Sequence, residues 1–382
     1  MYIYYLLILI LFFSQLLIFG KSNLTFANLD NIERVNYDNN FIRKKVFYLV
    51  LATIFFSLIV AFRDNTVGTD TNAYFREFYL TYSIPFSSLS LIDFVKGEYG
   101  YKLLIMISHQ IVINWRLFQF FYALLVSSSL AFFFYKYSTN TYVSCLLYIT
   151  IGTFAMSLTG IRQSIAIALV LYAYLCLKKK KYILTTLLLF YASSVHYTSL
   201  IMVGLLILNF MIENLDIKIR TWIIIGWLIP ITLFLFTDKI LNKFSFMLLN
   251  KYEYSGYYNE LNSTLNPIVI IMYITLFIYM FFGIYFHKRC IKNEEILFYI
   301  MSSLFVGCYL ASGTVYMLAR LSYYFSPYFI VLLTNTINYL PLNQKSKIIV
   351  EILLCFLCVL AFVISIPGNS YGIDNFIFSI EY

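Results

Sequence analysis

The chain is organised around the stretch Gly160-Ile161-Arg162-Gln163-Ser164, which opens an apolar segment that ends at four lysines, 178–181. A glycine frees the backbone just before a helix, and the first helical turn offers unpaired N–H groups at the positive end of the helix dipole. Arg162 adds a full positive charge there. The stretch therefore predicts an anion site, most simply for a phosphate, at the mouth of a membrane-spanning helix. The alternative is an arginine that reaches out to the lipid headgroups.

The composition indicates a membrane protein. Of the 382 residues, 61% are hydrophobic and only 12% are charged, which is more apolar surface than a soluble protein of this length buries. Many runs approach the ~20 apolar residues that cross a bilayer. We therefore expect an all-α fold, a polytopic bundle of transmembrane helices. The net charge of +9 follows the loop bias of membrane proteins, and the chain lacks the compact basic domain that nucleic-acid binding needs.

Twelve apolar segments are predicted to cross the membrane. They are 2–20, 45–62, 116–135, 141–158, 161–177, 182–195, 197–212, 221–237, 268–286, 295–312, 316–338 and 348–366. A further piece, 100–113, is short and carries His109 and Gln110, so we expect a re-entrant or interfacial helix there. We treat 1–382 as a single transmembrane domain with two long external loops, 63–99 and 238–267.

The lysines and arginines of the loops set the predicted orientation. With twelve spans the basic loop clusters all fall on the cytoplasmic side, and both ends of the chain lie outside. This twelve-span topology also places five side chains from distant parts of the sequence at the outer face: Arg63, Asp70, Arg162, His196 and Arg320. We therefore predict an outward-facing cationic cavity.

One long apolar segment is predicted to be broken. Residues 182–212 carry no charge over 31 positions, and a single helix here would invert every later loop. A break at Ser193-Ser194-Val195-His196 restores the charge rule, and serine suits a helix start. The fourteen residues before the break rise only about 21 Å, so the break lies inside the membrane, where it is tolerated if it lines a cavity. His196 is then a cavity residue; the alternative is a histidine packed and hydrogen-bonded between helices.

Cysteine and metal chemistry are not indicated. The six cysteines lie in or beside apolar segments, and the Cys355/Cys358 pair falls inside a predicted span, which favours buried packing over redox work. The predicted external loops hold no Asp-x-Asp, and no His or Cys group has the spacing of metal ligands. We expect neither a metal nor a cofactor.

Four motifs follow one another along the chain and resemble, as an ordered set, the pattern of the EpsG family, which is grouped with Wzy-type polysaccharide polymerases. They are carried by Arg63, Gly68, Asp70 and Tyr74; by Arg162 and Gln163; by His196 and Ser199; and by Arg320, Tyr324 and Phe325. The resemblance covers residues 40–340. One departure is Ala319, where the family often has an acidic residue, so Arg320 lacks an adjacent carboxylate.

The resemblance implies a bacterial glycosyltransferase with a GT-C-like bundle in the plasma membrane and its active site facing outside or the periplasm. Such enzymes polymerise oligosaccharide repeat units, carried on undecaprenyl pyrophosphate, into capsule, exopolysaccharide or O-antigen. The implied partners are that lipid-linked oligosaccharide, the lipid bilayer, a chain-length regulator and a flippase.

The chemical properties of the candidate residues, considered apart from the resemblance, also suit this reaction. The leaving group is a lipid pyrophosphate whose charge grows as the glycosidic bond breaks, and fixed cations in a water-poor site stabilise that charge. Arginine pairs with phosphate oxygens and stays protonated. Arg162 and Arg320 are the first candidates for the phosphate, followed by Arg63. Gln163, Tyr74 and Tyr324 complete the predicted substrate-binding set.

A general base is also needed, because the attacking sugar hydroxyl must lose a proton. His196 and Asp70 are the two candidates. Histidine titrates near neutral pH, whereas Asp70 lies nearer the aqueous side, where it is equally suited to holding Arg63 or a sugar hydroxyl.

Three other interpretations use much of the same pattern. A flippase or transporter for lipid-linked sugars would share the cationic cavity, but it should show internal repeats with matched broken helices, and none is evident. An O-antigen-ligase-like glycan transferase would have the same broad architecture, and the sequence does not separate it from a polymerase. A membrane O-acyltransferase would need a cytoplasmic route for its acyl donor, whereas His196 is predicted outside.

Overall fold

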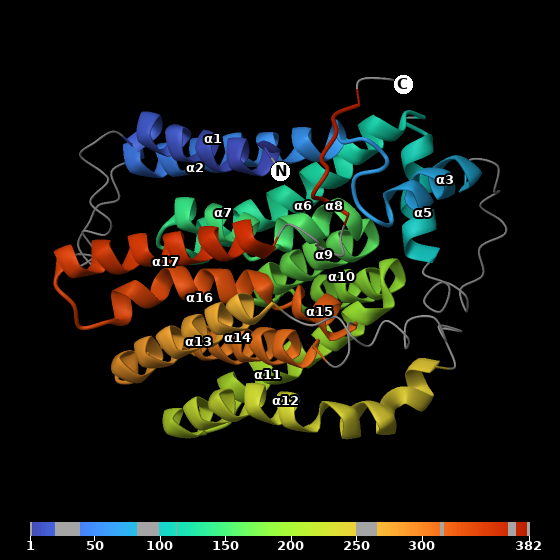
Figure 1. Cartoon of the computed structure of the whole chain (residues 1–382). Coiled ribbons are helices and arrows are strands. Elements are labelled where there is room, and N and C mark those ends of the chain that lie inside the picture. The colour runs from blue at the N-terminus through green and yellow to red at the C-terminus, as the bar shows by residue number, and fades with distance from the viewer. Residues whose placement is uncertain are drawn as a thin grey trace. The chain divides into compact units, whose positions relative to one another are not determined.

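The computed structural model is almost entirely helical (Figure 1). It describes residues 2–19, 39–81, 99–111, 113–249, 266–313, 317–365 and 372–379. Across these ranges the only β-pairing is one isolated antiparallel bridge between Arg63 and Phe378. The predicted all-α, polytopic fold is confirmed.

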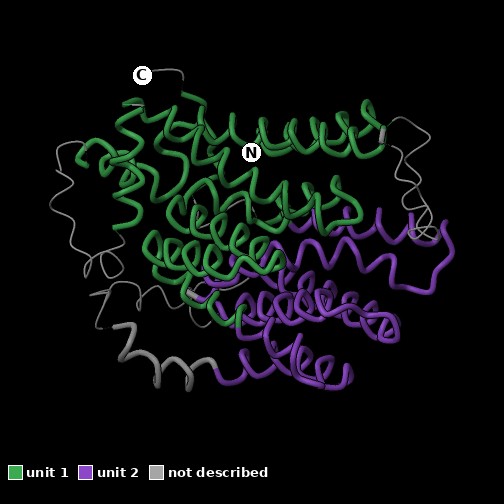
Figure 2. The backbone as a smooth tube through the Cα atoms, turned by 180° about the vertical axis from the view of Figure 1, so that it is seen from behind, with its two compact units in different colours: residues 1–206, 362–382 green, residues 207–361 purple. Residues whose placement is uncertain are grey.

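The chain divides into two compact units, residues 1–206 with 362–382 and residues 207–361 (Figure 2). The single transmembrane domain expected from the sequence stays a prediction.

Unit 1 holds the first three of the four motifs. Its helices are α1 (Tyr2–Phe19), α2 (Asn39–Ala61), α3 (Thr71–Thr81), α5 (Tyr99–His109), α6 (Trp115–Tyr137), α7 (Thr141–Thr150), α8 (Thr153–Thr159), α9 (Ile161–Leu177), α10 (Tyr182–Val195) and the 3-10 helix η3 (Tyr197–Met202). α2 packs along α6, and α9 packs between α6 and α10. α5 runs across the direction of α1 and α2 (Figure 1) and contacts both α3 and α10.

Unit 2 is built from α12 (Ile219–Leu249), α13 (Pro267–His287), α14 (Asn293–Ala311), α15 (Met317–Ser322), α16 (Ser326–Tyr339) and most of α17 (Gln344–Ser365). α11 (Val203–Asn214) begins in unit 1 and continues in unit 2. Glycines bring α12 and α14 close together: a Cβ on Gly307 would lie 2.7 Å from Leu233 Cδ1, and one on Gly226 would lie 2.2 Å from Tyr299 Cε1.

Each of the twelve predicted spans coincides with a helix or a pair of helices. Within the described ranges, eight helices are long and apolar enough to cross a membrane by themselves, and nine if the bent pair α7 and α8 is counted as one span. α9 and α10 are apolar but shorter, at 17 and 14 residues. The number of twelve spans therefore stays a prediction.

Two helix breaks position the site. The predicted break near His196 is confirmed: α10 ends at Val195, His196 is extended (φ −150°, ψ 113°), and η3 begins at Tyr197. The segment 141–158, expected as one span, is bent by 56° between α7 and α8. Gly152 makes that bend with φ 86°, a backbone conformation that glycine adopts without strain.

The predicted loops are partly helical. The expected loop 63–99 contains α3, and its residues 82–98 lie outside the described ranges. The expected loop 238–267 begins later than predicted, because α12 continues to Leu249; residues 250–265 are not described. The short piece at 100–113 is α5, whose 11 residues rise about 16 Å, too little to cross a bilayer.

Candidate functional site

The loop after α2 is folded tightly against the end of α8. Gly68 has φ +92°, and a Cβ there would lie 2.7 Å from the carbonyl oxygen of Leu158. Thr71 Oγ1 donates to Val67 O at 2.7 Å and also lies within hydrogen-bond distance of Leu158 O, at 3.2 Å. Gly68 is therefore needed for both its positive φ and the close approach of the two backbones.

Thr159 places this loop at the beginning of α9. Its hydroxyl is hydrogen-bonded to the Thr69 hydroxyl at 2.9 Å and accepts the backbone N–H of Asp70 at 3.3 Å. Thr159 directly precedes Gly160, after which α9 begins. The structure thus brings Asp70 to the same end of α9 as Arg162, as the sequence predicted.

Arg162 lies against two tyrosine rings. Its Cζ is 5.2 Å from the centre of the Tyr74 ring and 5.9 Å from that of Tyr101, within the range of cation–π attraction. Its Nε donates to the Tyr74 hydroxyl at 3.4 Å. The two rings themselves meet edge to face at 5.7 Å. Arg162 is therefore held against α3 and α5, and two residues that were predicted separately from the sequence, Arg162 and Tyr74, are in direct contact.

Arg63 is the most deeply buried cation of the site, with a relative exposure of 1%. Its Nη1 donates to Val60 O at 3.3 Å, whereas Nε and Nη2 have no hydrogen-bond partner among the described residues. The guanidinium interacts with the Tyr122 hydroxyl. Burying an ionised group with open donors costs free energy, so this arrangement suits a residue that pairs with an anion.

Tyrosines join the two arginines into a row. Arg63 interacts with Tyr122, and Tyr101 interacts electrostatically with both Tyr122 and Arg162. We call these four residues, together with Tyr74, the arginine–tyrosine row. Burial raises the pKa of the Tyr101 hydroxyl well above its ordinary value, and the nearby charge of Glu77 adds to the rise. Tyr101 is therefore a neutral hydrogen-bond donor.

The break at His196 lies beside the start of α5. A Cβ on Gly100 would lie 2.2 Å from Ser194 Oγ and 2.7 Å from the Ser194 carbonyl carbon. Tyr191 OH also donates to Gly100 O at 3.2 Å. Gly100 precedes Tyr101, so the half-buried His196 lies next to the turn of helix that carries the row. Gln163, in the first turn of α9, is buried at 2% exposure.

Arg320 and Tyr324 lie in unit 2. Arg320 is half-buried on the short helix α15, and Tyr324 follows in the turn before α16 with 1% of its surface exposed. The row belongs to unit 1, so a site that joins Arg320 and Tyr324 to it stays a prediction.

A C-terminal segment, residues 372–379, covers the loop at Arg63. Asp64 N donates to Ile377 O at 2.9 Å, and Ser379 N donates to Phe62 O at 3.0 Å. Arg116 donates to the backbone and side-chain oxygens of Ser379. This pairing could not be predicted from the sequence, because an extended segment of this length has neither helical periodicity nor a recognisable motif.

Sequence reasoning also missed Tyr101, Tyr122 and Glu77. Glu77 stands three residues after Tyr74 on α3, and such pairs share one helix face, which is the signal that would have found it. Tyr101 and Tyr122 lie in apolar helices, where a tyrosine usually packs as an aromatic ring.

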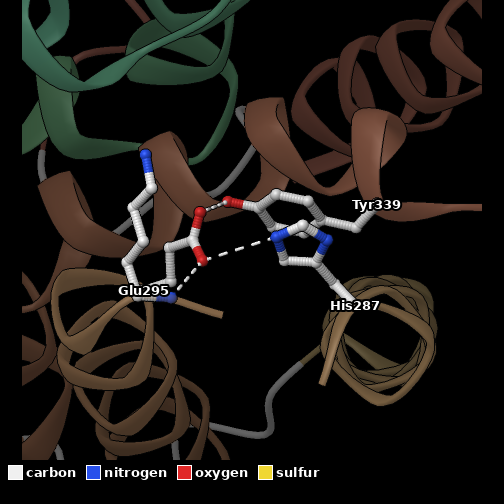
Figure 3. A network of polar contacts seen from close by, with 4 residues as sticks. His287, Glu295 and Tyr339 are labelled. Carbon is white, nitrogen blue, oxygen red and sulfur yellow. Dashed lines mark hydrogen bonds and ion pairs between the residues drawn. The ribbon is translucent and has the colours of Figure 1, made fainter. Parts of the chain in front are cut away.

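A second polar cluster joins three helices of unit 2 at their ends (Figure 3). Tyr339 OH donates to Glu295 Oε1 at 2.8 Å, and His287 Nε2 is 3.7 Å from Glu295 Oε2. The His287 and Tyr339 rings stack at 4.3 Å. The Lys292 backbone N–H donates to Glu295 Oε2 at 2.8 Å. The cluster ties α13, α14 and α16 together. Nowhere in the described ranges do three or more His, Cys, Asp or Glu side chains gather as metal ligands would.

The fold defines the class: a multi-pass α-helical membrane protein. The family model for EpsG matches residues 46–377, which is most of the chain, so the protein belongs to the EpsG family. That family is associated with Wzy-like polysaccharide polymerases, and the protein is a membrane protein of polysaccharide biosynthesis. Comparisons with curated proteins and with solved structures give no significant match.

Proposed function

We propose that this protein is a polysaccharide polymerase, a glycosyltransferase that joins oligosaccharide repeat units carried on undecaprenyl pyrophosphate at the outer side of the plasma membrane. The donor is the glycan of one lipid-linked unit, and the acceptor is the non-reducing end of another. The observation that carries the proposal is the arginine–tyrosine row, with Arg162 at the beginning of α9 and the buried Arg63 at its other end.

The row suits departure of a lipid diphosphate. As the glycosidic bond breaks, negative charge grows on the diphosphate oxygens, and fixed donors in a water-poor site stabilise that charge. Arg162 and Arg63 supply the charge, and the tyrosine rings hold Arg162 in place before substrate arrives. In this proposal Gln163 and Tyr74 contact the same substrate. Arg320 and Tyr324, which belong to unit 2, keep the substrate-binding roles predicted from the sequence.

The acceptor hydroxyl needs a base, and His196 and Asp70 are the two candidates. Asp70 lies at the beginning of α9 through Thr159, and His196 lies at the break beside α5. We expect substitution of the true base, by His196→Gln or Asp70→Asn, to lower kcat by about 10²–10⁴-fold. Substitution of the other residue should act mainly on KM.

Purified full-length protein with a synthetic lipid-linked repeat unit provides the test, with products resolved by length. The wild type should yield a ladder of polymers, and Arg162→Ala and Arg162→Lys should each abolish it while membrane levels stay normal. Transfer of finished glycan to a different acceptor would identify a ligase, and lipid translocation without bond formation would identify a flippase. Either result contradicts the proposal.

Orientation is tested separately with cysteine labelling from one side of the membrane. The exposed native Cys290 reports the end of α13, which is predicted to be cytoplasmic. A cysteine at the exposed Thr66 reports the loop that carries Asp70. Reaction of both with an impermeant reagent added outside would contradict the outward-facing site.

A further inference from the structure

Three buried polar side chains of α5 and α6 lie at the arginine–tyrosine row with atoms that have no hydrogen-bond partner. The Tyr101 hydroxyl, the Tyr122 hydroxyl and both amide atoms of Gln119 all lack a hydrogen bond of normal geometry within the described part of the chain. Their exposures are 0%, 3% and 0%. Buried polar groups are nearly always satisfied in proteins, so three such side chains beside a buried arginine need an explanation.

Helix geometry places these groups together. Gln119 and Tyr122 are three residues apart on α6 and therefore share one face. The centre of the Phe118 ring lies 6.5 Å from that of the Tyr101 ring and 6.0 Å from that of the Tyr122 ring, so Phe118 packs against both tyrosines. The Tyr122 oxygen faces Arg63, which leaves its proton free to be donated elsewhere.

The charges around Tyr101, Gln119 and Tyr122 favour binding of an anion that accepts several hydrogen bonds. Arg63 and Arg162 stand at its two ends, and the tyrosine hydroxyls between them are donors. The facing carboxylates are Glu77, which acts on Tyr101, and Asp374, which acts on Tyr4 together with Arg63. Gln119 differs from the tyrosines because its amide both donates and accepts, which suits a sugar hydroxyl more than a phosphate oxygen.

We infer that Tyr101, Gln119 and Tyr122 form a binding site for the glycosyl diphosphate head of the lipid-linked donor, between Arg63 and Arg162. The inference rests on the proposed function and deepens it. The two tyrosine hydroxyls donate to the diphosphate, and the Gln119 amide binds a hydroxyl of the first sugar.

The test measures binding by the purified full-length protein in lipid nanodiscs, with undecaprenyl diphosphate, undecaprenyl phosphate and a glycosylated diphosphate as probes. The variants Tyr101→Phe and Tyr122→Phe each remove one oxygen and keep the ring. Each should weaken diphosphate binding by about tenfold or more and monophosphate binding less. Gln119→Leu should weaken binding of the glycosylated diphosphate and leave the bare diphosphate unchanged.

Tyr174→Phe is the matched control. Tyr174 is fully buried on α9, twelve residues beyond Arg162, where its ring packs against Phe133 and Tyr137. It should bind all three lipids as the wild type does. Because the Tyr101 hydroxyl lacks a hydrogen-bond partner among the described residues, its removal should not lower the thermal stability of the protein.

Wild-type affinity for the diphosphate in both tyrosine variants would overturn the inference. So would a fall in thermal stability with an unchanged preference between the two lipids, because that result assigns the hydroxyls to structure. The inference and the proposed function fail separately. If the wild type polymerises and both tyrosine variants bind diphosphate normally, only the inference about Tyr101 and Tyr122 is refuted. If diphosphate binding depends on Tyr101 but the wild type does not polymerise, only the proposed function is refuted.

Discussion

The guanidinium of Arg162 lies over the ring of Tyr74, with 5.2 Å between Cζ and the ring centre. Arg162 belongs to the first turn of α9, and Tyr74 belongs to the first turn of α3, after the loop that carries Asp70. The contact therefore joins two motifs that are 88 positions apart in sequence. It fixes the cation at a helix beginning, where the helix dipole adds to its field.

The Tyr74 ring is expected to matter more than its hydroxyl. The hydrogen bond from Arg162 is long, at 3.4 Å, whereas the ring provides a cation–π contact of about 0.5–2 kcal/mol. Tyr74→Phe should keep near-normal polymer synthesis, and Tyr74→Leu should lower turnover by about two- to thirtyfold. Initial rates with the lipid-linked repeat measure this. An equal loss in both variants would show that the hydroxyl is the important group.

Gly68→Ala should disable the site without touching a reactive group. The new Cβ would meet the Leu158 carbonyl oxygen at 2.7 Å, and φ is +92°, so the loop must shift at a cost of about 1–3 kcal/mol. We expect loss of polymer with normal protein levels in the membrane. Gly204→Ala is the control, because a Cβ there meets nothing within 4 Å. Normal synthesis by G68A would show that the loop need not approach α8.

Some of this site follows from sequence, and some does not, for identifiable reasons. Arg162 and Asp70 were predicted to share one face because loop charges set which helix ends lie on the same side, and the structure brings both to the beginning of α9 in unit 1. The break at His196 was predicted from the same charge rule. A meeting of Arg320 with these residues stays a prediction, because α15 belongs to unit 2.

Tyr101, Gln119 and Tyr122 were beyond sequence reasoning because a polar group inside an apolar helix has the same pattern whether it packs or binds. Only its surroundings show that its polar atoms lack partners. Segment 372–379 was missed because its pairing partner lies more than 300 positions away, as with Arg63 and Phe378. The bend at Gly152 was missed because apolar residues continue on both sides of it.

Arg116→Ala should loosen the C-terminal segment. Arg116 donates two hydrogen bonds to Ser379, and their loss should raise the opening equilibrium of residues 372–379 by about tenfold or more. Amide hydrogen exchange of the peptide that contains this segment measures the change. The control is Arg76→Ala, an exposed arginine on α3. Unchanged exchange in R116A would show that the backbone bridge at Arg63 alone holds the segment.

Acid should weaken the same loop through Asp64. Its carboxylate accepts the backbone N–H of Thr66 at 2.9 Å and the Thr66 hydroxyl at 2.7 Å, and these bonds hold the pKa of Asp64 below its ordinary value of 3.8. The folded pKa is depressed, so the stabilisation is complete above pH 3.8 and is lost as pH falls through the lower folded pKa. Amide exchange in residues 62–67 should therefore rise there in the wild type. In Asp64→Asn, amide exchange in residues 62–67 should show no such rise as the pH falls below 3.8. An equal rise in this variant would show that another group is responsible.

The cluster at Glu295 should contribute to the stability of unit 2 and not to the chemistry of the row. Glu295→Gln removes the carboxylate that faces His287 and weakens the bond from the Tyr339 hydroxyl (Figure 3), a loss of about 1–3 kcal/mol. Thermal unfolding of the purified protein should shift downward, with diphosphate binding unchanged below the transition. Asn293→Ala, at an exposed position beside it, should leave the unfolding temperature unchanged. Loss of diphosphate binding by folded E295Q would show instead that the ends of α13, α14 and α16 are coupled to the arginine–tyrosine row.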